Sequence, residues 1–190
     1  MPSEPPVTIT VDGLDVAVEV AGAEKGATVV LLAAAHQAPA AYEAVCERLH
    51  TASLRTVVIA AHPRLTGNAV VGILDSLDIR WALLVGDRLG AELAWELAAT
   101  RLDRFIGLVV IDRGHPRVAD LGGVIRDENC PPVELNTTAL VSTAAARAVA
   151  RASQRFVYGD YRIVELQGRR NAADSTAQLA AEIVMRSSTW

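Results

Sequence analysis

Residues 74–112 read LDSLDIRWALLVGDRLGAELAWELAATRLDRFIGLVVID, and this stretch decides the fold. A helical pattern that ends at Leu77 is followed by an apolar run over Trp81–Val85 and then by the tight sequence GDRLG at 86–90. An alanine-rich helical pattern and a second apolar run, Leu108–Ile111, come next. Apolar runs without polar alternation are typical of parallel strands buried on both faces. The stretch therefore predicts helix–strand–helix–strand within a parallel sheet.

The same alternation continues outward in both directions. Helical patterns separate further apolar runs, which are Thr28–Ala35, Arg55–Ala61, Thr138–Val141 and Arg162–Leu166. Asn68 and Asp174 are the expected N-caps of two of these helices. Residues 7–20 alternate apolar and polar around Asp12-Gly13, which predicts an antiparallel hairpin. The expected fold is α/β, a mostly parallel sheet with helices on both faces and an N-terminal antiparallel hairpin.

Length and composition narrow the class of protein. The chain has 190 residues, 51% of them hydrophobic, and a net charge of −4. One α/β domain over 1–190 is expected, with no nucleic-acid partner because no basic stripe is present. The apolar runs are strand-sized, which predicts no membrane span. Two unmatched thiols, Cys46 and Cys130, behind an N-terminus without an export signal favour a cytoplasmic location.

Residues 86–90 also carry a family resemblance. Gly86 and Gly90 match the small residues of a small-x-nucleophile-x-small elbow, which turns the chain sharply from a strand into a helix. With the surrounding strands and helices, which cover nearly the whole chain, the sequence resembles the α/β-hydrolase family. The resemblance implies that residues 113–137, a segment rich in Gly, Pro and charge and long for a connection, are a reduced lid or loop that is functional or mobile.

The sequence departs from the family at its catalytic positions. Arg88 occupies the place of the nucleophile, and Arg169–Asn171 stand where the catalytic His would follow the last strand. A guanidinium stays protonated and cannot attack a carbonyl. Asp112 lies at a position that some members use for the acid. The resemblance thus implies a pseudoenzyme with a degenerate triad and no catalytic residues, although an atypical enzyme remains open.

Candidate ligand-binding residues are expected at the carboxyl ends of the strands. Arg88, with Leu89 beside it at a helix N-terminus, could hold a carboxylate or phosphate, or it could simply pair with Asp87 or Asp112. His36, near the expected oxyanion loop, and Asp112 and His115 complete the candidate set. Asp87 itself is disfavoured as a nucleophile because its flanking residues, Val85 and Leu89, are too large for the turn.

No metal or cofactor is expected. The four His residues, His36, His50, His62 and His115, lack metal-ligand spacing. Lys25 is not part of a phosphate-binding loop, and residues 86–90 supply only two of the glycines of a dinucleotide fingerprint. Three functions stay open. The first is a non-catalytic protein that binds a small anionic ligand or a protein partner in the former active-site cleft. The second is a hydrolase or esterase with an atypical site of His36, Asp112 and His115, and the third is an oligomerising interaction module.

Overall fold

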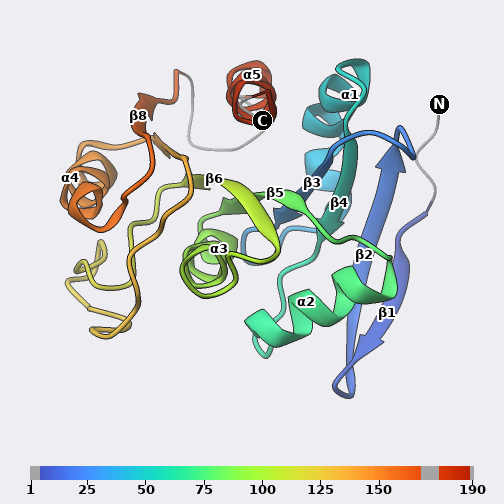
Figure 1. The fold of residues 1–190 in the computed structure, drawn as a ribbon, viewed down its shortest axis with the longest axis horizontal. Coiled ribbons are helices and arrows are strands. Elements are labelled where there is room, and N and C mark those ends of the chain that lie inside the picture. Colours follow the sequence, from blue (N-terminus) through green and yellow to red (C-terminus); the bar gives the residue numbers. More distant parts are fainter. Residues whose placement is uncertain (1–4, 168–175, 189–190) are drawn as a thin grey trace.

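The computed structural model describes residues 5–167 and 176–188, and its framework is a sheet of eight strands in the order β1-β2-β4-β3-β5-β6-β7-β8 (Figure 1). From β3 onward, neighbouring strands run parallel, whereas β2 pairs antiparallel with both β1 and β4. The strands are β1 (Val7–Val11), β2 (Leu14–Gly22), β3 (Thr28–Leu32), β4 (Arg55–Ile59), β5 (Ala82–Asp87), β6 (Phe105–Ile111), β7 (Thr137–Val141) and β8 (Tyr161–Glu165). The predicted parallel sheet and hairpin are confirmed.

Helices cover both faces of this sheet, as Figure 1 shows. One face packs against α2 (Gly67–Ser76), α3 (Leu89–Thr100) and α4 (Ala144–Ser153). The other face packs against α1 (Glu43–Thr51), which follows the short helix η1 (Pro39–Tyr42), and against α5 (Thr176–Ser187). A further short helix, η2 (Gln154–Phe156), follows α4.

Two apolar cores explain why the central strands lack polar alternation. In β3, Val30 and Leu32 point into the core under α2 and α3, whereas Val29 and Leu31 point into the core under α1 and α5. Successive side chains of a strand face opposite sides of the sheet. Both faces are covered here, so every position of β3 is buried.

Some expected details were wrong or lie outside the described residues. The N-cap of α2 is Thr66, whose hydroxyl accepts from the Ala69 N–H at 3.2 Å, and not Asn68. Thr66 has the extended backbone that an N-cap requires, while Asn68 already lies inside the helix. Asp174 and Arg169–Asn171 fall among residues that the structure does not describe.

The segment 113–137 runs from the carboxyl end of β6 to the amino end of β7 and is anchored by hydrogen bonds at several points. The backbone N–H groups of Arg126 and Asp127 both donate to the Pro116 carbonyl, at 3.1 and 3.2 Å. Val133 forms an isolated parallel bridge with Val157. Leu121, Val124 and Ile125 are exposed at the tip of the segment. These backbone contacts fix the path of the segment between β6 and β7.

Across the described ranges, none of the helices is long and apolar enough to traverse a lipid bilayer.

Candidate functional site

A sharp turn joins β5 to α3, and close backbone packing requires its two glycines. A Cβ on Gly90 would lie 2.0 Å from the carbonyl oxygen of Leu32, and one on Gly86 would lie 2.5 Å from the Cα of Ala91. Between them Arg88 has φ 50° and ψ −102°. A non-glycine residue in such a sparsely populated region carries about 1–3 kcal/mol of strain, which the surrounding structure must offset. The chain thus builds a strained elbow whose central residue is Arg88.

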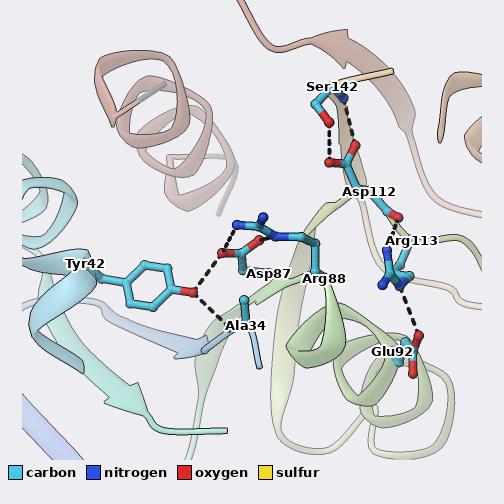
Figure 2. A network of polar contacts seen from close by, with 8 residues as sticks. All are labelled: Ala34, Tyr42, Asp87, Arg88, Glu92, Asp112, Arg113 and Ser142. Carbon is cyan, nitrogen blue, oxygen red and sulfur yellow. Dashed lines mark hydrogen bonds and ion pairs between the residues drawn. The ribbon is translucent and has the colours of Figure 1, made fainter. Parts of the chain in front are cut away.

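The guanidinium of Arg88 is bound to the residue before it (Figure 2). Its Nε donates to Oδ1 of Asp87 at 3.0 Å, and its Nη2 donates to Oδ2 at 3.2 Å. The Asp87 side chain is 1% exposed and that of Arg88 is 34% exposed. The hydrogen bonds from the guanidinium to Asp87 raise the pKa of Arg88, so the ion pair holds a permanent positive charge beside a buried carboxylate.

Tyr42, at the end of η1, completes this network. Its hydroxyl donates to Oδ2 of Asp87 at 2.7 Å and accepts from the Ala34 N–H at 2.8 Å. Burial raises the pKa of Tyr42, so the phenol is a neutral donor. Ala34 lies in the loop after β3, the region that supplies one oxyanion-hole N–H in acyl-transfer members of this fold. In this chain the Ala34 N–H already has an internal acceptor.

Asp112 directly follows β6, the strand that pairs with β5. Its side chain points away from Arg88 and toward Ser142, which follows β7 (Figure 2). Its carboxylate accepts from the backbone N–H of Ser142 at 2.7 Å and from the Ser142 hydroxyl. Asp112 also has a positive φ of 55°. The carboxylate therefore fastens the end of β7, and Arg88 and Asp112 share the strand edge without a direct ion pair among the contacts of the described residues.

His115 is buried and forms its ring hydrogen bonds with backbone groups. The side chain is 0% exposed and packs between Trp95 and Phe156. Its Nδ1 accepts from the Arg117 N–H at 3.2 Å, and its Nε2 donates to the Pro131 carbonyl at 2.8 Å. Both ring nitrogens are thus used to hold segment 113–137 in place. Burial lowers the pKa of His115, in agreement with a neutral ring.

His36 lies in the loop that follows β3. It is exposed in a turn closed by a hydrogen bond from the Gln37 N–H to the Ala34 carbonyl, and its φ is 60°. The atypical site of His36, Asp112 and His115 would need these three side chains to meet. Within the part of the chain that the structure describes, Asp112 and His115 bond to other residues and not to each other.

A pocket of about 320 Å³ opens beside the elbow, on the side of α3 that faces α2 and segment 113–137. Leu89 and Gly90 of the elbow line it, whereas Arg88 does not. Its other lining residues come from the ends of β3 and β4, the loop that follows β4, the outer side of α3, and segment 113–137. The sequence indicated Leu89 and segment 113–137 as candidates, whereas the outer side of α3 carries no motif that indicates a pocket.

The parallel sheet, the two helical layers and the strained β5–α3 elbow together define the α/β-hydrolase fold, and this chain has that fold. Three solved structures with TM-scores of 0.74–0.78 are similar to it over nearly their full length. A hydrolase from Pseudomonas aeruginosa is 15% identical with a TM-score of 0.78, covering 97% of this chain and 98% of that one. Epoxide hydrolase A from Mycobacterium thermoresistibile is 13% identical with a TM-score of 0.75, covering 95% and 98%. An epoxide hydrolase from Vigna radiata is 13% identical with a TM-score of 0.74, covering 97% and 98%. At these identities the likeness establishes the fold alone.

No protein-family model and no curated protein sequence matches the chain.

Proposed function

We propose that this chain is a non-catalytic ligand-binding protein built on the α/β-hydrolase fold. One observation carries the proposal: the elbow presents Arg88, and its guanidinium is held in a two-point ion pair by the buried carboxylate of Asp87. Arginine cannot act as a nucleophile because it stays protonated. The Asp87 carboxylate is also a poor nucleophile, since it is buried and accepts hydrogen bonds from both Arg88 and Tyr42.

The general base is also absent from its usual place. Acyl transfer on this fold needs a His that activates the nucleophile and protonates the leaving group. The sequence contains His at 36, 50, 62 and 115 and none after β8. Of these, His115 has both ring nitrogens engaged in the fold. The loss of nucleophile, base and the free Ala34 N–H supports a binding function.

The open pocket beside Leu89 is the ligand site that we propose. Ligand sites in open α/β sheets lie outside the carboxyl ends of the strands, and this pocket does so. An anion held by Arg88, the first hypothesis from the sequence, would have to compete with Asp87 for the same guanidinium. The open pocket also favours a binding function over a pure interaction module. A protein partner and a cytoplasmic location stay predictions.

Hydrolysis remains the second candidate function, because the strained elbow is retained and several similar structures are epoxide hydrolases. The purified chain should be assayed with short activated esters and with a small epoxide, using heat-denatured protein as the blank. The proposal predicts no turnover above that blank. Turnover that persists in Arg88→Ala and disappears in Asp112→Asn would establish an atypical hydrolase instead.

A further inference from the structure

The pocket beside Leu89 has a mainly apolar lining. Leu32 and Ile59, at the ends of β3 and β4, line the pocket together with Leu65, Leu89 and Leu93. A volume of about 320 Å³ lies at the small end of ligand pockets, which span about 300–1,000 Å³. Such a cavity has room for a short alkyl chain or a single small ring, and its lining favours an apolar ligand body.

The charges of the carboxylate and guanidinium groups around the pocket do not cancel one another. Glu92 is neutralised, because its Oε1 accepts from Arg113 Nε at 3.0 Å and lies 3.8 Å from Arg126 Nη1. Arg126 is further occupied, because its Nη2 donates to the Gly114 carbonyl at 2.7 Å. The remaining carboxylates, Glu96 and Asp127, also line the pocket.

Neither Glu96 nor Asp127 has an ion-pair partner among residues 5–167 and 176–188. Asp127 uses one oxygen, Oδ1, to accept from the Asn129 N–H at 2.9 Å. Both side chains are exposed at the mouth, where a ligand headgroup would meet them. The pocket therefore combines an apolar interior with a net negative rim.

We propose that the pocket binds an organic cation with a short apolar body, such as a primary alkylammonium. The alkyl part would replace water against Leu65, Leu89 and Leu93, and the ammonium would lie between Glu96 and Asp127. Apolar burial supplies most of the affinity, and the rim charges select the sign of the headgroup. The inference rests on the proposed binding function and gives it a ligand class, which is the opposite in charge to the anion expected at Arg88.

Three probes of equal chain length test the sign of the headgroup: hexylammonium, 1-hexanol and hexanoate, titrated into the full chain by calorimetry. We expect hexylammonium to bind most tightly and hexanoate least tightly. In the double variant Glu96→Gln/Asp127→Asn, hexylammonium should lose about fivefold in affinity, as expected for two exposed charge contacts, while 1-hexanol binds as before. Asparagine at 127 keeps an oxygen for the Asn129 N–H.

Glu128→Gln is the matched control, because Glu128 is an exposed carboxylate on the same segment that does not line the pocket. This variant should bind all three probes like the unmodified chain. Hexanoate binding as tightly as hexylammonium, no binding of any probe, or an equal loss in the control and the double variant would overturn the inference. Turnover of an ester or epoxide would refute the non-catalytic function alone, because these titrations measure binding in its absence.

Discussion

The guanidinium of Arg88 donates to both carboxylate oxygens of Asp87, at 3.0 and 3.2 Å, across the strained turn where the fold normally presents a nucleophile. Adjacent residues rarely face each other along a strand, because successive side chains point to opposite sides. Here the chain leaves the strand between them, and the positive φ of Arg88 brings its side chain back over Asp87. The geometry of the elbow thus places the side chains of Arg88 and Asp87 side by side as an ion pair.

A double-mutant cycle should detect this ion pair. Arg88→Met and Asp87→Asn should each destabilise the chain, and the double variant should be more stable than the sum of the two losses allows. We expect a coupling energy of about 1–3 kcal/mol, the range for contacting residues that share one network. Urea denaturation of the four proteins measures it. Additive losses would show that the two side chains do not interact in solution.

Small anions should not depend on Arg88 for binding. Phosphate and acetate would have to displace Asp87, whose carboxylate is buried and also bonded by Tyr42. We therefore expect the same melting temperature with and without each anion, in the unmodified chain and in Arg88→Met alike. A rise of several degrees in the unmodified chain that Arg88→Met abolishes would restore the anion site, since a ligand at about a hundredfold excess over its Kd adds about 2.7 kcal/mol.

Gly90→Ala should be among the most damaging single substitutions. The new Cβ would lie 2.0 Å from the Leu32 carbonyl oxygen, a backbone atom that cannot move without separating α3 from β3. We expect a loss of about 3 kcal/mol or more, or no soluble protein. Gly123→Ala is the control: its φ is also positive, at 82°, but no atom lies within 4 Å of the new Cβ. A loss of about 1 kcal/mol is expected there.

The two glycine variants are compared by their soluble yield and by the urea concentration at the midpoint of unfolding. Equal stability of Gly90→Ala and the unmodified chain would contradict the close packing of the elbow.

His115 should make stability depend on pH. Burial lowers its pKa in the folded chain, so below the ordinary value of about 6.5 the unfolded chain binds more protons. The stability that the neutral His115 ring contributes is fully present above this ordinary pKa. It is lost as pH falls through the ordinary pKa toward the lower pKa of the folded chain. His115→Gln should cost about 1–3 kcal/mol at about pH 7.5, because two buried hydrogen bonds change, and should flatten the decline toward about pH 5.5.

Urea midpoints across that range, with His50→Gln alongside, measure the effect. The comparison is needed because burial also lowers the pKa of His50. An unchanged slope in His115→Gln would rule out the buried neutral ring.

The sequence predicted the fold well and the site only in part. Apolar runs such as Thr28–Ala35 and the glycines at 86 and 90 are local signals, and they located β3 and the elbow correctly. The sequence does not indicate the role of Tyr42, because its bond to Asp87 joins residues 45 positions apart. No local signal at His115 indicates its burial, because Trp95 and Phe156, the rings that enclose it, are distant from it in the sequence.

The rim of the pocket was missed for a similar reason. Glu96 lies in a helix and Asp127 in a connecting segment, with no spacing that relates them. Their common position follows from the path of segment 113–137 over α3, which depends on contacts such as Arg126 with Glu92. No periodicity encodes such a path.

Whether the elbow supports hydrolysis is best determined by experiments in heavy-oxygen water. Epoxide hydrolysis that passes through an ester of a protein carboxylate places solvent oxygen in the protein side chain first and in the product from the second turnover onward. Direct attack by water on either substrate places solvent oxygen in the product in every turnover. The unmodified chain and Arg88→Ser should be incubated with an activated ester and an epoxide, and products and peptides weighed by mass spectrometry. We expect no heavy oxygen in the products beyond the protein-free blank and none in peptides that contain Asp87 or Asp112. Label in the product that increases with protein concentration, or label in either peptide, would contradict this expectation.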